Sequence, residues 1–135
     1  MRFHRIAVMA FGIAAAGCQP GANPAMYQVA TSVQGATLQI QTSTGRKEGE
    51  LLSVRDDGVI VFLRDGRVAL VPWSSTTLVV AKGMGREYQY GSRIPPYASV
   101  KKNLILVSHY PQGMTPEIQA RVLASKGQAQ LVMLQ

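Results

Sequence analysis

Two aspartate–glycine pairs, close together in the chain, constrain the fold more than any other feature of the sequence. They are Asp57-Gly58 and Asp65-Gly66, and this pair of residues suits the positive φ angles of tight hairpin turns. In the short segments around them apolar and polar residues alternate, as in half-buried strands. Pro72 cannot donate a ladder hydrogen bond and ends the fourth segment. The pattern predicts a small closed or nearly closed barrel, with five strands at residues 36–41, 47–55, 59–63, 67–71 and 77–81.

The same region carries the turn order of a known type of barrel. It begins at Thr42-Ser43-Thr44-Gly45, continues through Gly49, which predicts a bulge or a sharp bend, and closes with Val71-Pro72-Trp73-Ser74-Ser75. This run resembles the Sm-like and Src-homology-3-like small barrels, including their short turn before the last strand. The resemblance implies a barrel at residues 36–81 and, by analogy, rings formed through edge strands such as the one ending at Ala81. The positions through which Sm proteins contact RNA are not convincingly present, so we expect no nucleic acid partner.

The C-terminal part, residues 103–135, is expected to add a strand, a helix and another strand, packed against the barrel. Asn103–His109 is apolar on both faces, which is typical of a buried strand. Thr115-Pro116 provides an N-cap and a suitable first helical residue, and Gly127 is expected to end the helix. Leu131–Leu134 would be the last strand. The expected fold class is mainly β, a β-rich α+β fold in which a strand–helix–strand segment follows a five-stranded small barrel.

Residues 82–102 are expected to form a basic and aromatic loop. A loop of this length in a compact domain is usually functional or disordered. Cations interleaved with aromatic rings can hold anionic polymers or sugars through charge and stacking. The candidate ligand-binding residues are Arg86, Tyr88, Tyr90, Arg93, Tyr97, Lys101 and Lys102. The favoured alternative is that the tyrosines cover the barrel mouth while the cations remain solvated, and that Trp73 packs in the core instead of forming a ligand platform.

The start of the chain has the layout of a secretory signal. Arg2 and Arg5 precede the uncharged apolar run Ile6–Ala16, and small residues lead directly to Cys18. The apolar run is too short to span a membrane, because a transmembrane helix needs about 20 such residues. The sequence therefore predicts export, followed by removal of residues 1–17.

The segment Ala15-Ala16-Gly17-Cys18 resembles the lipobox of bacterial lipoproteins, with Ala15 where that family usually has leucine. The resemblance implies that Cys18 carries acyl chains and is the mature N-terminus, with residues 18–35 containing the lipidated cysteine and a tether. Gln19 follows, without the aspartate of the inner-membrane retention signal, so the outer membrane facing the periplasm is favoured in a cell with two membranes. The alternative is an ordinary signal peptide that ends near a buried cysteine.

The cysteine content and the net charge limit which bonds, metal sites and binding partners the chain can have. Cys18 is the only cysteine, which excludes an internal disulfide and a cysteine-rich metal site. Removal of the leader lowers the formal net charge from +7 to +5, because Arg2 and Arg5 leave with it. This mild excess favours an anionic neighbour, such as lipid headgroups or an acidic envelope polymer.

Residues for catalysis are few. His109 is the only histidine after the leader, and we expect a structural or surface role for it at a strand end. Asp56-Asp57 belong to a turn, and Ser74-Ser75 have no neighbouring base in the sequence. Glu48 and Glu50 are expected to share one strand face as solvated charges. We therefore expect no cofactor, no metal ion and no enzymatic activity.

The expected function is that of a lipid-anchored cell-envelope protein that binds a partner without catalysing a reaction. The barrel and its basic loop would contact another envelope protein, peptidoglycan or an anionic glycan of the cell wall, while the N-terminal lipid holds the membrane. One alternative is a subunit of an Sm-like oligomeric assembly in the envelope. The least favoured alternative is an enzyme that uses His109.

Overall fold

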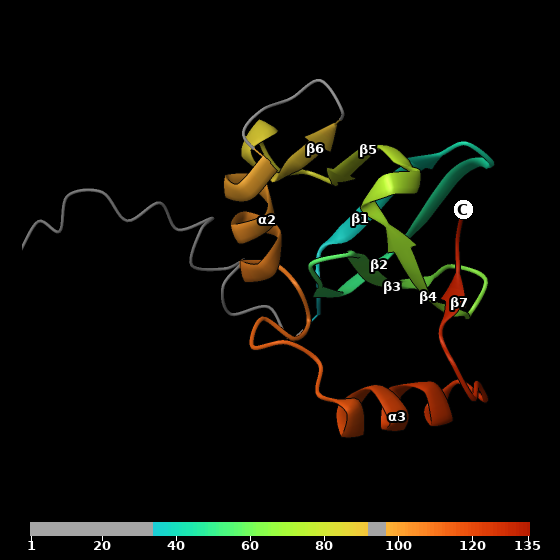
Figure 1. Cartoon of the computed structure of the whole chain (residues 1–135). Coiled ribbons are helices and arrows are strands. Elements are labelled where there is room, and N and C mark those ends of the chain that lie inside the picture. The colour runs from blue at the N-terminus through green and yellow to red at the C-terminus, as the bar shows by residue number, and fades with distance from the viewer. Residues whose placement is uncertain (1–33, 92–96) are drawn as a thin grey trace, which may run out of the picture.

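One sheet and two α-helices make up the structure, a computed structural model that describes residues 34–91 and 97–135 (Figure 1). The strands are β1 (Thr37–Thr42), β2 (Gly45–Val54), β3 (Gly58–Leu63), β4 (Val68–Pro72), β5 (Thr76–Ala81), β6 (Gln89–Gly91) and β7 (Val132–Met133). The helices are η1 (Trp73–Ser75), η2 (Arg86–Tyr88), α2 (Tyr97–Leu106) and α3 (Pro116–Ser125). None of the helices in the described residues is long and apolar enough to cross a membrane.

The seven strands form a single open sheet in the order β6-β5-β1-β2-β3-β4-β7. β1 to β4 form an antiparallel meander, β5 returns antiparallel to the other side of β1, and β7 runs parallel to β4. The mainly β fold class is thus confirmed. The expected closed barrel is wrong, because β6 and β7 are the two ends of the strand order.

The five strands expected in residues 36–81 are present, but one of their turns works differently. Gly66 has the positive φ of 88° that the Asp65-Gly66 turn was expected to need. Gly58 does not, and instead lies at the buried start of β3. A Cβ atom there would lie 2.2 Å from the backbone oxygen of Val71 in β4, so glycine is required by the close approach of two strands.

Side chains on the inner face of the curved sheet pack against one another and against α2. Most strands contribute buried aliphatic side chains to this inner core, and α2 together with the residue after it adds Val100, Leu104 and Val107. These three positions recur at helical spacing, and Leu106 between them is 62% exposed. The strand expected at Asn103–His109 is therefore wrong. Residues 82–102 are also not one loop, because they include η2, β6 and the start of α2.

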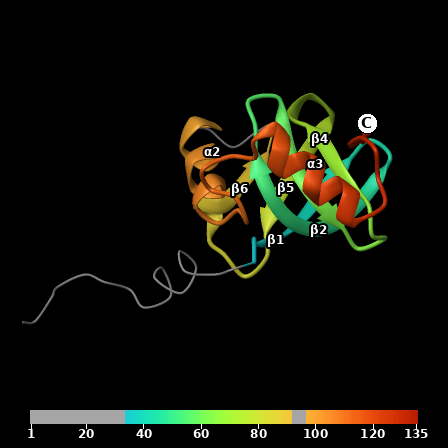
Figure 2. The same cartoon turned by 90° about the horizontal axis from the view of Figure 1, so that it is seen from below.

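The outer face of the sheet is covered by α3 (Figure 2). Leu123 of α3 packs with Leu52, Ile60, Val68 and Leu70 in a second, outer core. β2 contributes to both cores because successive residues of a strand point to opposite faces, so Leu51 lies in the inner core and Leu52 in the outer core.

The ends of α3 agree with the sequence prediction. The backbone N–H of Ile118 donates to Thr115 Oγ1 at 3.3 Å, and Pro116 occupies the first helical position. Gly127 follows the Lys126 cap with a φ of 69°. The last strand is reduced to the two residues of β7, so helix, helix and short strand replace the expected strand–helix–strand segment.

The outer edge of β4 is closed by the C-terminal residues. The amide side chain of Gln128 pairs with the backbone of Val68 as a neighbouring strand would. Its Oε1 accepts a hydrogen bond from Val68 N at 2.6 Å, and its Nε2 donates to Val68 O at 3.0 Å. Next along the edge, Ala69 and Leu70 pair with β7, and Leu134 N donates to Leu70 O at 3.0 Å. The backbone groups of β4 are therefore engaged and do not offer a free edge for another chain.

Replacing Gln128 by alanine is expected to lower the free energy of unfolding by about 1–3 kcal/mol, because Val68 is fully buried and would lose both side-chain partners. Chemical denaturation of the mature protein measures this change. Gln130→Ala, an exposed glutamine two residues away, is the control and should be close to neutral. Equal stability of the two variants would show that Gln128 does not hold the edge.

Candidate functional site

Most of the predicted ligand-binding residues lie at one corner of the fold. We call the assembly of η2, β6 and α2 the α2 corner (Figure 1). Asn103 Nδ2 donates to Glu87 O at 2.8 Å and ties α2 to η2. The predicted residues with described side chains are Arg86 and Tyr88 on η2, Tyr90 on β6, and Lys101 and Lys102 on α2. Tyr97 begins α2, while Arg93 and the lipid-attachment residue Cys18 lie outside the described residues.

The two tyrosines of the corner lie against the inner core. Tyr88 and Tyr90 are partly buried and pack on the core cluster that contains Trp73. The rings of Tyr90 and Trp73 meet edge to face, with centroids 5.1 Å apart and planes at 62°. Trp73 is 9% exposed, and its Nε1 donates to Arg55 O at 3.3 Å. The indole is therefore a core side chain, as expected, and the tyrosines present only part of their surfaces to a ligand.

The cations of the corner differ in their surroundings. Lys101 forms an ion pair with Asp56 in the β2–β3 hairpin, and the hydrogen bond and charge of its ammonium group lower the pKa of that carboxyl group. Arg86 and Lys102 are exposed and make no ion pair within the described residues. These two side chains are the ones whose charge is available to a partner.

A second polar cluster joins positions that sequence reasoning left apart. His109 Nδ1 lies 2.8 Å from Glu50 Oε1, and the same oxygen accepts a hydrogen bond from Gly35 N, also at 2.8 Å. His109 N further donates to Leu51 O at 2.9 Å. The side chain of Glu50 is 26% exposed and has two partners, so the expectation of a solvated charge is wrong for it.

Glu48 also departs from that expectation. Its side chain is 17% exposed and forms ion pairs with Arg64 and with Lys82, the latter at 3.3 Å. Neither glutamate cluster could be predicted from the sequence, because the partners lie far apart in the chain. His109 is 59 residues from Glu50, and Lys82 is 34 residues from Glu48.

The Glu50–His109 pair links elements and offers little for catalysis. A carboxylate that orients an imidazole also needs a nucleophile within hydrogen-bonding reach of the ring. Ser108, the adjacent hydroxyl, is 5% exposed and donates to Ile105 O at 2.7 Å. No group of three or more histidine, cysteine or acidic residues among the described residues could hold a metal ion. The Glu50–His109 pair instead holds β2, the segment after α2 and the start of the described chain together.

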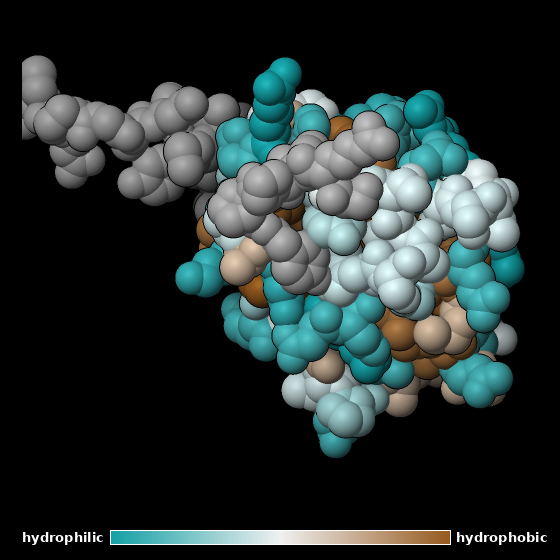
Figure 3. Space-filling model, turned by 45° about the horizontal axis from the view of Figure 1, so that its top comes forward, coloured by the Kyte–Doolittle hydropathy of each residue, from teal (hydrophilic) through white to brown (hydrophobic). Residues whose placement is uncertain are grey.

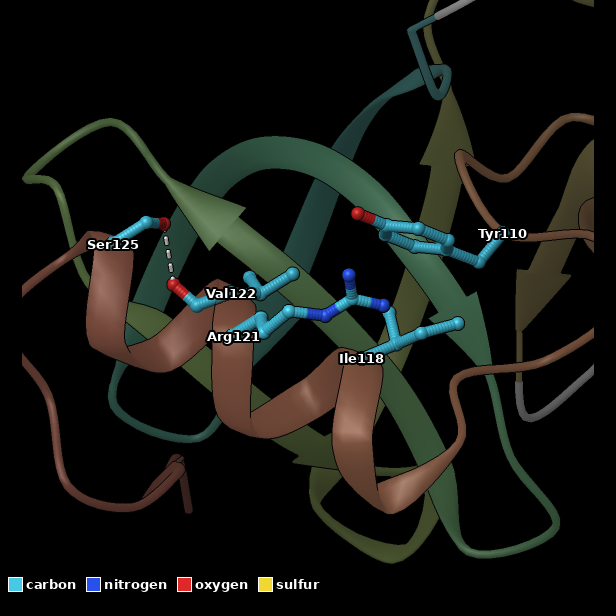
Figure 4. A pocket seen from close by; sticks show the side chains of 5 residues that line it. All are labelled: Tyr110, Ile118, Arg121, Val122 and Ser125. Carbon is cyan, nitrogen blue, oxygen red and sulfur yellow. Dashed lines mark hydrogen bonds between the residues drawn. The ribbon is translucent and has the colours of Figure 1, made fainter.

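A shallow groove of about 350 Å³ runs along α3 (Figure 4). Ile118 and Val122 form its apolar part, and Arg121 extends along the helix toward Tyr110 on the opposite side. Ser125 Oγ donates to Val122 O at 2.7 Å, so this hydroxyl is engaged within the helix. A larger open hollow of about 510 Å³ lies at the β2–β3 hairpin, where it is lined by Val54, Arg55, Asp56 and Asp57.

The edge strand expected to support ring assembly is not a free edge. β5, which ends at Ala81, pairs with β1 on one side. On its other side Leu78, Val79 and Val80 pair with the three residues of β6. The expectation that β5 serves as an assembly edge is therefore wrong along these residues.

Comparison of the chain with protein-family models, with curated proteins and with solved structures finds no match. Function is therefore inferred from the leader sequence and from the geometry of the α2 corner.

Proposed function

We propose that this chain is a lipid-anchored protein of the cell envelope, and that its folded domain binds a partner without catalysing a reaction. The observation that carries the proposal is the leader. A basic start, an uncharged apolar run and small residues end at Cys18, the single cysteine of the chain. A free thiol would be reactive in an oxidising compartment, and acylation of Cys18 removes that thiol. In a cell with two membranes, the outer membrane facing the periplasm is the favoured site.

The domain then meets its partner through the α2 corner. Arg86 and Lys102 are exposed there without an ion pair in the described residues, and Tyr88 and Tyr90 of the same corner pack on the inner core and are only partly buried. Exposed cations beside aromatic rings favour anionic partners, through charge and stacking. An anionic cell-wall polymer or an acidic face of another envelope protein has this chemistry.

Binding to an anionic polymer is expected to weaken when the two free cations are removed. In Arg86→Ala and Lys102→Ala variants of the mature lipoprotein, each loss should raise the Kd for polymer isolated from the same envelope by about twofold to fivefold, the range of exposed ionic contacts. The effect should shrink as salt screens the charges. Affinity and its salt dependence are measured by sedimentation with the polymer.

Arg46→Ala is the matched control, because Arg46 is exposed in the β1–β2 hairpin and likewise has no ion pair in the described residues. An unchanged Kd in a variant that combines Arg86→Ala with Lys102→Ala would contradict binding at the α2 corner. An equal loss of affinity in the Arg46→Ala variant would contradict it as well. A photo-crosslinking residue at position 86 in intact envelopes separates the two partner classes, because it captures either polymer or a defined protein. Turnover of a substrate without retention of a partner would contradict the non-catalytic proposal.

A further inference from the structure

The described chain begins at a fixed place beside α2. Gly35 N donates to Glu50 Oε1 and Ala36 N donates to Val107 O, each at 2.8 Å. A Cβ atom on Gly35 would lie 1.8 Å from Leu51 O, so this entry is closely packed. Val107 directly follows the last residue of α2. The described chain therefore enters the fold at the C-terminal end of that helix.

The exposed side of α2 presents an apolar residue at this exit. Ala98, Lys102 and Leu106 are exposed and spaced by four residues, so they share one face of the helix. The opposite face, with Val100 and Leu104, is buried in the inner core. Leu106 is 62% exposed, the highest value among the large apolar side chains of the described residues.

The rest of the surface makes this position unusual. On the face shown in Figure 3, hydrophilic and neutral side chains cover most of the surface, and apolar surface appears in a few patches, the largest at the lower right. The other exposed large apolar residues are Leu78 at 36% and Met133 at 58%, on β5 and β7. Leu106 alone among these three adjoins the point where the chain enters the fold.

We propose that the α2 face with Leu106 and Lys102 lies on the membrane that holds the lipid anchor, with Leu106 in the interface and Lys102 at anionic headgroups. The inference rests on the proposed function, because it requires acylated Cys18. Sixteen steps of chain from Cys18 to Gln34 span at most about 55 Å, which confines the domain near the bilayer. The exit beside Leu106 is the part of the described fold closest along the chain to the anchor.

The energies fit an orienting contact and not an independent anchor. Burial of one leucine side chain and attraction of one lysine to an anionic surface together give only a weak contact. Such a contact would not hold a free protein, but a tether raises its effective concentration. Of the acids close by, Asp56 pairs with Lys101 and Glu50 pairs with His109, while Glu87 lies exposed in η2. Lys102 belongs to the α2 corner, and the proposed membrane contact uses the same side chain.

Site-specific fluorescence on the full lipoprotein tests the inference. Acylation blocks Cys18, so Leu106→Cys introduces the only reactive thiol, and an environment-sensitive dye is attached there. The labelled protein is reconstituted in phosphatidylcholine vesicles that contain anionic phosphatidylglycerol and nitroxide-labelled lipid. We expect a blue-shifted spectrum and strong quenching of the dye. Met133→Cys is the matched control, because Met133 has nearly the same exposure on β7 and should remain unquenched.

The outcomes separate the anchor from the contact. Protein that floats with the vesicles but shows equally weak quenching at positions 106 and 133 keeps the anchor and overturns the contact. Protein that does not float overturns both. Lys102→Glu should reduce quenching at position 106, and equal quenching in vesicles without phosphatidylglycerol would overturn the role of charge. A dye at position 106 that is shielded in whole envelopes but not in vesicles would instead identify a protein partner and contradict the lipid contact.

Discussion

Replacement of Leu104 by alanine is expected to lower the free energy of unfolding by about 2–5 kcal/mol. Leu104 is fully buried and projects from α2 into the inner core, beside Val100 and Val107. Truncation removes favourable burial and leaves a cavity that the surrounding strands fill only in part. Because the stability of small domains is typically about 5–15 kcal/mol, the loss is a large share of the total. Thermal and denaturant unfolding of the purified mature protein measure it.

Leu106→Ala is the matched control and also tests the helix itself. It makes the same chemical change two residues later, at a side chain that is 62% exposed, and should alter stability by no more than about 0.5 kcal/mol. In a strand, residues 104 and 106 would share one face and the two variants would be similarly destabilised. Similar losses would therefore contradict α2, while a large loss at Leu104 alone supports it.

Replacement of Cys18 by serine is expected to remove the protein from the membrane fraction or to leave it as an uncut precursor. In the proposed lipoprotein the acyl chains on Cys18 would supply the membrane affinity, at about 0.8 kcal/mol for each buried CH2 group, and serine has no thiol to carry them. Fractionation of cells and intact-mass measurement of the N-terminal peptide report both effects. The folded domain should be unaffected, since residues 34–135 contain no cysteine.

Gln19→Ser is the control for this change, because it alters the adjacent residue and keeps the thiol. That variant should be cut, acylated and membrane-bound like the natural sequence. If Cys18→Ser were cut normally and remained on the membrane, lipid attachment would be excluded, and the contact proposed for Leu106 would lose its basis.

Local turn chemistry explains why so much of the sheet could be predicted from the sequence. The strands between residues 36 and 81 are bounded by residues such as Gly66, which is free to adopt a positive φ, and Pro72, which has no N–H to donate, and these properties act wherever the residues occur. Closure of the sheet is different, since it depends on how β6 and β7 meet the ends of the meander. The end of α2 was predicted as a strand because a short apolar run, Leu104 to Val107, is compatible with a buried strand or a buried helix, and its start lies in the segment expected to be a loop.

The candidate site shows the same division. Sequence identified the cations and tyrosines of residues 82–102 by their type, but it could not distinguish Lys101, which pairs with Asp56, from Lys102, which is exposed. That difference arises because the fold brings α2 beside the β2–β3 hairpin with Lys101 in contact with Asp56. The Glu50–His109 pair was also missed, because only tertiary structure brings β2 to the segment that follows α2.

The place where the chain enters the sheet has a mechanical consequence. A domain tied to a membrane by its N-terminus experiences tension along that connection whenever its partner moves. The tension acts first on the contacts of Gly35 and Ala36, and then on β1, which lies between β2 and β5 and not at an edge of the sheet. Extraction of β1 would require rupture of two hydrogen-bonded ladders, whereas an edge strand would yield after one. In the proposed anchored protein, tension from the N-terminus would therefore act on β1, which is hydrogen-bonded to a neighbouring strand on each side.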